Sequence, residues 1–337
     1  MPIALALGIV LNSAFLFVIA RVPYMRTITN YYLVNLCIAD ILYISFAVSD
    51  KLLRYETSAV AIDQSIHGEI GCIVFYGIMD IAYFVSLFTV VLYTVERFVA
   101  ITFPFRAQMM SSKKRTLILI AITWLTAIVF AIPSMVGNSE RHVMHFIWPP
   151  GYDSFPEVVE TCYTTNGDLA YLAVGINVIP FCLSLVIVVI LNAIICIKIL
   201  RENKIGESAR SKSSLTARNQ VVRMLFVTSI LFFILLFPFE FASISPLFDP
   251  DPAGTGAIPV EIFGAWIQYS RVLSYINSVI NPIIYNAMSA RYRRAFIRAF
   301  FCREAGKTEK KSTSYTTRTT TADSSVLYTQ ISLNKSK

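Results

Sequence analysis

The sequence has few charged residues. Only 15% of its 337 residues are Asp, Glu, Lys or Arg, whereas 55% are hydrophobic and the mean hydropathy is +0.61. A soluble domain carries about 25% charged residues, so the composition indicates lipid rather than water as the main solvent of the chain. The net charge of +8 would suit nucleic acid, but the basic residues lie in short stretches between apolar runs and near the C-terminus. That distribution is typical of membrane topology and argues against a nucleic-acid partner.

The sequence also lacks the features of a membrane enzyme or a transporter. Its three histidines, His67, His142 and His145, all lie outside the long apolar stretches, so no helix offers metal-ligand spacing. No internal repeat is visible, although a transporter would be expected to carry repeats around a midplane site. No short apolar stretch with a small-residue cleavage site indicates a signal peptide, so we expect the first span to direct insertion. Both classes stay as weak alternatives.

Seven apolar stretches are long enough to cross a bilayer, for which roughly 20 residues suffice. Backbone groups in lipid must hydrogen-bond internally, so the stretches are expected to be helices packed into one all-α, seven-transmembrane bundle. The seven stretches are Met1–Ala20, Tyr31–Leu53, Ile70–Ile101, Thr116–Val136, Leu169–Ile197, Val222–Leu247 and Ile262–Met288.

The loops differ in charge on the two sides of this predicted bundle. One side, with the C-terminal tail, holds 24 of the 29 Lys and Arg residues and is therefore expected to be cytoplasmic, with the N-terminus outside. The outer loops carry eleven carboxylates against four basic groups, a field that would concentrate a cationic ligand. Ordinary solvated acidic loops are the alternative. Only eleven residues precede Asn12, so we expect the natural N-terminus to be longer.

Several polar residues fall inside the predicted spans, where a charge costs at least about 2.5–3.5 kcal/mol. Asp40 lies in the middle of the second span, and Asn277, Ser278 and Asn281 lie in the seventh. With Ser86 of the third span, these oxygen-bearing groups are suited to a hard cation such as sodium. The alternative is a hydrogen-bonded polar core without an ion.

Charges and prolines near the ends and middles of the spans suggest a bundle with two arrangements. Glu96-Arg97 closes the third span, although such a pair at a helix end is usually only a surface feature. Pro180, Pro238 and Pro282 fall inside spans five, six and seven, and each is expected to bend its helix. Three bends around a polar midplane favour two packings of the same helices.

One short motif in each span gives the sequence its family resemblance. From Asn12 to Cys302 the chain resembles the rhodopsin-like (class A) G-protein-coupled receptors, with the motifs in the family's order. They are Gly8-Ile-Val-Leu-Asn12, Asn35-Leu-Cys-Ile-Ala-Asp40, Cys72, Glu96-Arg97-Phe98 with Pro104-Phe105, Trp124, Pro180, Phe232 through Pro238, and Asn281-Pro-Ile-Ile-Tyr285.

The resemblance implies roles for particular residues. It pairs Cys72 with Cys162 in a disulfide, and it makes Asp40, Ser86, Asn277, Ser278 and Asn281 an allosteric sodium pocket. It assigns G-protein coupling to Glu96, Arg97, Phe105 and Tyr285. It also implies a short cytoplasmic amphipathic eighth helix around Tyr292–Phe296 and palmitoylation of Cys302.

Four residues depart from the family pattern. Phe98 stands where a tyrosine is usual at the end of the third span, a mild change, and Leu235 stands where a cysteine is usual. Leu236 stands where an aromatic residue is usual before the proline of the sixth span, and Val188 stands where a tyrosine often partners the tyrosine of the seventh. The usual aromatic switch and tyrosine pair cannot be carried over. We expect activation to depend instead on Phe232 repacking against Leu87 and Pro180.

The same resemblance narrows the classes of ligand to be expected. Tyr275 occupies the place where opsins attach retinal, and Met79 the place where amine receptors carry an aspartate, so both classes are disfavoured. Likeness to neuropeptide receptors, and the long second outer loop at 137–168, favour a short extracellular peptide over a non-peptide small molecule. The expected ligand-binding residues are Met79, Asp80, Phe239, Glu240, Gln268, Arg271 and Tyr275, with Asp50 nearby. Alternatively, Arg271 simply pairs with Glu240 or Asp80.

The expected organisation is one receptor domain at 1–300 and a tail at 301–337. The tail is polar and rich in Ser and Thr, so it is predicted to be disordered. Thr317, Thr320 and Asp323 resemble a phosphorylation pattern read by arrestin after receptor kinases have acted. A tail with no ordered partner is the alternative. We expect a plasma-membrane protein that is not an enzyme and needs no cofactor beyond a possible sodium ion.

Overall fold

The apolar stretches fold as long helices joined by short connections. The computed structural model describes residues 1–110, 112–137, 140–162, 167–205, 212–248 and 260–301. In chain order its elements are α1 (Pro2–Arg21), η1 (Pro23–Met25), α2 (Ile28–Thr57), η2 (Ser65–His67), α3 (Gly68–Thr102), α4 (Pro104–Met110), α5 (Lys113–Gly137), β1 (Arg141–His145), β2 (Val158–Cys162), α6 (Gly167–Ile205), α7 (Lys212–Phe248), α8 (Val260–Met288) and α9 (Ala290–Phe301).

The seven expected spans correspond to α1, α2, α3, α5, α6, α7 and α8, which confirms the helical bundle. Within the described residues, six of these helices contain a segment long and apolar enough to cross a membrane. The seventh, α8, has 29 residues and is therefore long enough, but Gln268, Arg271, Asn277 and Asn281 make it more polar than the others. The polar groups that lower its hydropathy are those from which a site was predicted.

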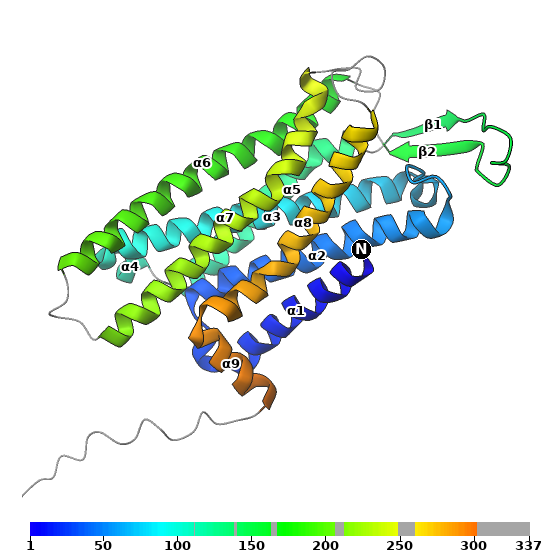
Figure 1. Cartoon of the computed structure of the whole chain (residues 1–337). Coiled ribbons are helices and arrows are strands. Elements are labelled where there is room, and N and C mark those ends of the chain that lie inside the picture. Colours follow the sequence, from blue (N-terminus) through cyan, green and yellow to red (C-terminus); the bar gives the residue numbers. More distant parts are fainter. Residues whose placement is uncertain (111, 138–139, 163–166, 206–211, 249–259, 302–337) are drawn as a thin grey trace, which may run out of the picture. The chain divides into compact units, whose positions relative to one another are not determined.

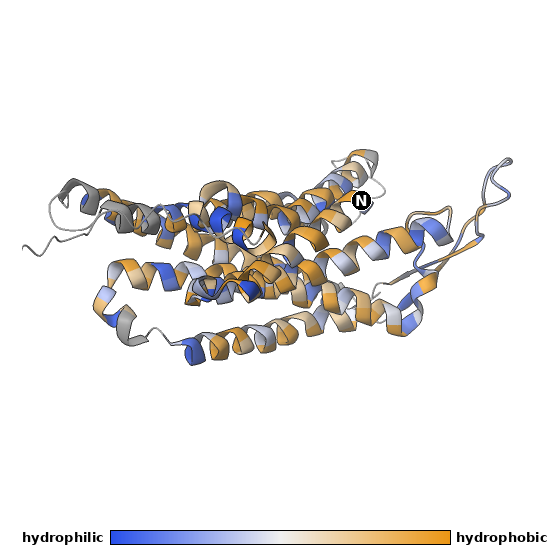
Figure 2. Cartoon of the chain, turned by 90° about the horizontal axis from the view of Figure 1, so that it is seen from below, coloured by the Kyte–Doolittle hydropathy of each residue, from blue (hydrophilic) through white to orange (hydrophobic). Residues whose placement is uncertain are grey.

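Helix α3 is the centre of the bundle. It contacts α2, α5 and α6 extensively, and its buried face includes Phe84, Leu87, Val90 and Tyr93. Large apolar side chains also point outward, among them Leu125 on α5 and Leu183 and Ile190 on α6. Figure 2 shows hydrophobic residues along most of the length of the helices and hydrophilic residues at many of their ends. A bundle that is apolar inside and outside is suited to lipid.

The two ends of the bundle differ. In Figure 1 the hairpin β1–β2 extends at one end, and α9 lies at the other. The strands pair antiparallel from Arg141 opposite Cys162 to His145 opposite Val158, and they form within the loop predicted at 137–168. This small sheet is the one departure from the all-α expectation among the described residues.

Two short helices follow spans. Helix α4 was not predicted; Pro104 is its first residue, a position where the missing N–H of proline costs nothing. Helix α9 contains the Tyr292–Phe296 segment and packs on α1 through buried Tyr292, Ala295 and Ala299. That α9 lies along a membrane stays a prediction. The predicted tail, with Cys302 and its Ser and Thr residues, lies outside the described residues beyond Phe301.

A buried leucine on α2 and an exposed leucine on α5 allow the packing of the core to be tested with matched substitutions. Leu33 on α2 is 0% exposed, whereas Leu125 on α5 is 64% exposed. Leu33→Ala should therefore lower the free energy of unfolding by about 2–5 kcal/mol, because it leaves a cavity. Leu125→Ala should leave the melting temperature nearly unchanged in thermal unfolding of the purified protein. Equal melting temperatures for the two variants would contradict the assigned burial.

Candidate functional site

A cavity opens between the helices on the hairpin side of the bundle. It has a volume of about 280 Å³, and α2, α3, α5, α6, α7 and α8 all contribute side chains to it. Six of the seven expected ligand-binding residues line it together: Met79, Asp80, Phe239, Glu240, Arg271 and Tyr275. The seventh, Gln268, is exposed on α8 and is not among the lining residues. Six of the residues that the sequence grouped together therefore lie at one cavity, whereas Gln268 lies elsewhere on α8.

Three charged side chains line this cavity without neutralising one another. Glu240 is only 4% exposed, and Asp80 Oδ2 is buried without a hydrogen-bond partner. Within the part of the chain that the structure describes, Arg271 forms no ion pair with either carboxylate. The alternative in which Arg271 pairs with Glu240 or Asp80 is therefore not the arrangement found. A buried carboxylate oxygen without a partner is costly, so a ligand that donated a hydrogen bond to Asp80 Oδ2 would gain binding energy.

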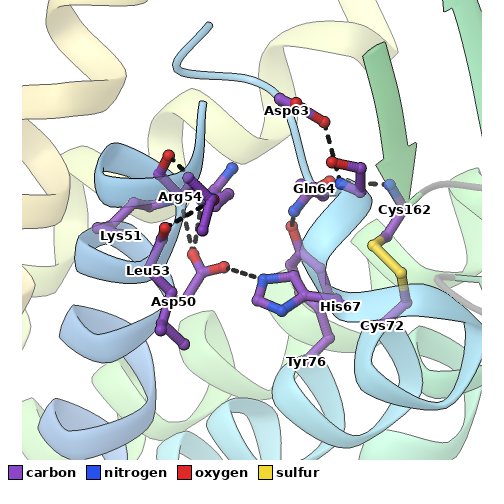
Figure 3. Close-up of polar contacts among 12 residues, drawn as sticks. Asp50, Lys51, Leu53, Arg54, Asp63, Gln64, His67, Cys72, Tyr76 and Cys162 are labelled. Carbon is purple, nitrogen blue, oxygen red and sulfur yellow. Dashed lines mark hydrogen bonds and ion pairs between the residues drawn. A yellow bond between two sulfur atoms is a disulfide. The ribbon is translucent and has the colours of Figure 1, made fainter. Parts of the chain in front are cut away.

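Asp50 also lines the cavity, but its carboxylate is already saturated. Oδ2 lies 2.6 Å from an Arg54 guanidinium nitrogen and 3.0 Å from Lys51 Nζ, and Oδ1 lies 2.8 Å from His67 Nε2 (Figure 3). Both oxygens of this carboxylate are thus paired with neighbouring side chains, and little of its hydrogen-bonding capacity remains for a ligand. Sequence reasoning missed this cluster, although the four-residue spacing of Asp50 and Arg54 on a helix is a known signal for an ion pair.

The hairpin is covalently fixed to the bundle beside the cavity. Cys72 on α3 and Cys162 on β2 form a disulfide with Cα atoms 5.7 Å apart, as the resemblance implied. Arg141 of β1 forms an ion pair with Glu160 of β2. The end of β2 is therefore tied to the first turns of α3.

A second polar cluster lies deeper in the bundle. Asp40 is 1% exposed, and Asn281 donates a hydrogen bond from Nδ2 to Asp40 Oδ2 at 2.8 Å. Ser86, Asn277 and Ser278 are buried as well, so all five predicted residues are enclosed. Asn277 Oδ1 is buried and, within the described residues, has no hydrogen-bond partner. An oxygen without a donor, close in sequence to a carboxylate-bound asparagine, fits a hard cation better than a closed hydrogen-bond network.

Amide side chains join the helices around this cluster. Asn12 donates to the carbonyl oxygen of Ser278 at 2.8 Å, which links α1 to α8. Asn35 donates to Thr89 Oγ1 at 2.7 Å and accepts from Trp124 Nε1 at 2.8 Å, which links α2 to α3 and α5. The motif residues Asn12, Asn35 and Trp124 therefore connect five helices in two groups, α1 with α8 and α2 with α3 and α5.

A further cavity of about 460 Å³ opens on the α9 side, with Glu96 and Arg97 in its wall. Arg97 Nε donates to Glu96 Oε2 at 2.7 Å, and a second guanidinium nitrogen donates to Thr29 Oγ1 on α2. Tyr285 is fully buried beside Phe15, with ring centroids 5.2 Å apart. Arg97 is thus restrained by two partners.

Phe105 is exposed, whereas Leu236 and Val188, which depart from the family pattern, are buried. Phe105 stands on α4 with 84% of its surface exposed. Leu236 and Val188 are buried in the main apolar core, together with Phe232 and Leu87. Apolar packing therefore takes the place of the usual aromatic switch and tyrosine pair, and the role of Phe232 in activation stays a prediction.

Comparison with known proteins agrees with this arrangement. The family described as "7 transmembrane receptor (rhodopsin family)" matches residues 11–285. The neuromedin-U receptor 2 of Mus musculus is 27% identical over 86% of this chain and 71% of its own length.

Two further relatives are similar at about the same level. The thyrotropin-releasing hormone receptor of Gallus gallus is 25% identical over 92% of this chain and 79% of its own length. The tachykinin-like peptides receptor 86C of Drosophila melanogaster is 25% identical over 95% of this chain and 61% of its own length. With the family match covering most of the chain, the helical bundle and its motif residues belong to a membrane receptor of the rhodopsin family.

Proposed function

We propose that this receptor binds a short extracellular peptide and activates a heterotrimeric G-protein. The observation that carries the proposal is the outer cavity, in which Asp80, Glu240 and Arg271 are present without forming ion pairs with one another. Such a set suits a ligand that has both a basic group and a carboxylate or amide end. Peptides have both, and a single small amine or acid has only one.

The relatives and the hairpin support a peptide. The tachykinin-like peptides receptor is named for peptide ligands, and the thyrotropin-releasing hormone receptor is named for a hormone. The hairpin β1–β2 extends the bundle on the cavity side and offers additional surface for a ligand larger than the cavity. We further propose a plasma-membrane location, with the hairpin and the N-terminus outside and the basic α9 side in the cytoplasm.

The cytoplasmic roles follow the resemblance. Arg97, released from Glu96 and Thr29, would contact the G-protein in the opened cavity, and exposed Phe105 would enter an apolar pocket on that protein. Tyr285 would move inward with α8. We propose that α9 lies along the inner leaflet with palmitoylated Cys302, and that the 301–337 tail takes phosphate from receptor kinases and then binds arrestin.

The ligand-binding prediction concerns Arg271. A peptide-library screen in cells with a promiscuous G-protein should identify an activating peptide. Arg271→Ala should raise its half-maximal concentration by about 10- to 100-fold, because one charged hydrogen bond contributes about 1.5–3 kcal/mol.

Surface expression, measured by antibody binding to intact cells, should stay at the parent level. Arg271→Lys is the matched control, since it keeps the charge but loses the paired donors of the guanidinium group. Its half-maximal concentration should lie between those of the parent receptor and of Arg271→Ala. An unchanged concentration–response curve for Arg271→Ala would remove this residue from the site. Activation only by non-peptide molecules would favour the small-molecule alternative.

The coupling prediction concerns Arg97. In membranes from cells that express the receptor, the activating peptide should stimulate nucleotide exchange on a G-protein. Arg97→Ala should abolish that stimulation while peptide binding persists, because the residue lies on the opposite side of the bundle from the cavity. Full nucleotide exchange in the variant would refute the assigned role of Arg97, whereas a parent protein that stimulates no exchange would reopen the transporter alternative.

The sodium prediction concerns Asp40. The residues present fit sodium, which Asp40, Ser86, Asn277, Ser278 and Asn281 would hold through oxygen atoms. Raising sodium chloride in place of choline chloride should weaken agonist binding to the parent receptor several-fold. In Asp40→Asn the sodium and choline curves should coincide, since the charge that attracts the ion is gone. A parent receptor without any sodium dependence would support the closed polar core instead.

A further inference from the structure

The segment between α2 and α3 contains a glutamine that forms hydrogen bonds through both ends of its side-chain amide. Gln64 is only 6% exposed. Its side chain donates from Nε2 to the hydroxyl of Tyr76 at 2.6 Å and accepts at Oε1 the backbone N–H of Cys162 at 2.8 Å. Tyr76 lines the ligand cavity, and Cys162 is the disulfide-bonded end of β2. One side chain thus connects the cavity wall with the hairpin (Figure 3).

The backbone around Gln64 strengthens this connection. The N–H of Gln64 donates to the carbonyl oxygen of Glu160 at 2.7 Å, and the N–H of Glu160 lies 3.4 Å from Asp63 Oδ1. The short helix η2 follows at once, and its last residue, His67, donates a backbone hydrogen bond to the carbonyl of Gln64 at 3.0 Å. Asp63 and Gln64 therefore lie beside β2 and are hydrogen-bonded to it, and η2 continues from them.

The same segment is joined to the cavity a second time. The imidazole of His67 is buried against Asp50, with Nε2 2.8 Å from Oδ1, and it packs on the ring of Phe75 with centroids 4.6 Å apart. Asp50 lines the cavity and also binds Arg54 and Lys51. Two cavity-lining residues from two helices, Asp50 of α2 and Tyr76 of α3, are thus bonded to one loop segment.

We propose that Gln64 and Asp50 are positioning residues of the ligand site, which connect the cavity wall to the hairpin through residues 63–67 so that the two respond to ligand as one unit. The disulfide joins β2 to α3 one helical turn before Tyr76 and does not touch the Tyr76 side chain. Gln64 adds a second connection, from β2 to the hydroxyl at the end of that side chain. The effect on ligand response rests on the proposed function, whereas the mechanical link does not.

The link is tested first without ligand. Tyr76→Phe removes a single hydroxyl from the cavity wall and with it the bond to Gln64. In hydrogen-exchange mass spectrometry of the purified full-length protein, backbone amides of residues 158–162 should exchange about fivefold faster, the effect of one lost hydrogen bond. Tyr43→Phe is the matched control, because its hydroxyl also lies in this cavity but bonds to Ser274 of α8, 3.0 Å away. Unchanged exchange in Tyr76→Phe, or equal changes in both variants, would overturn the link.

The second test uses the activating peptide and a double-mutant cycle. Gln64→Leu and Tyr76→Phe should each raise the half-maximal concentration about fivefold, with the maximal response and the surface level unchanged. If both act through one bond, the double variant should also be about fivefold weaker, and a product of about 25-fold would refute coupling. If Gln64→Leu does not reach the surface, Gln64→Met keeps the length of the side chain without the amide, and its cycle with Tyr76→Phe is read in the same way. A parent receptor that no peptide activates would defeat the proposed function alone, because the exchange measurement still decides the link.

Discussion

The cost of an unpaired polar group in lipid governs this structure. Every backbone amide within the bilayer must be satisfied locally, which requires helices, and every side chain that is not apolar must find a partner inside the bundle. Asn12, Asn35 and Trp124 meet this requirement by bonding across helices, and Asp40 meets it through Asn281. Two of the buried oxygens that have no partner within the described residues, Asp80 Oδ2 and Asn277 Oδ1, belong to the places where a ligand and an ion are proposed.

The same constraint explains how much of the fold could be predicted. The lengths of the apolar stretches determined seven helices, and their boundaries agree with the structure to within a turn or two at most ends. Helix α4 and the hairpin could not be derived in this way, because they lie beyond the apolar stretches, where turn chemistry and tertiary contacts decide. The local features associated with them are Pro104, the first residue of α4, and Cys162, the disulfide-bonded end of the hairpin.

The site was only partly accessible to sequence reasoning. Motif positions predicted that Asp80, Glu240 and Arg271 would meet, and the structure places all three at one cavity. Helical spacing puts Gln268 on nearly the same face of α8 as Arg271, but the structure leaves Gln268 exposed and outside the lining of the cavity. Gln64 and Tyr76 were missed altogether. Their contact depends on the path of an irregular loop, for which no periodicity exists in the sequence, and only the three-dimensional structure brings the loop back onto β2.

The cavity has a consequence for how a ligand must approach it. Asp50 and Lys51 of α2 both line it but pair with each other at 3.0 Å, which leaves Asp80 of α3 and Glu240 of α7 as its acidic groups and Arg271 of α8 as its basic group. The cavity is therefore negative towards α3 and α7 and positive towards α8. A molecule with separated positive and negative ends would be favoured in one orientation over the reverse one. Selection by dipole direction would act before any close contact forms, and it would discriminate between two peptides of the same composition and opposite sequence.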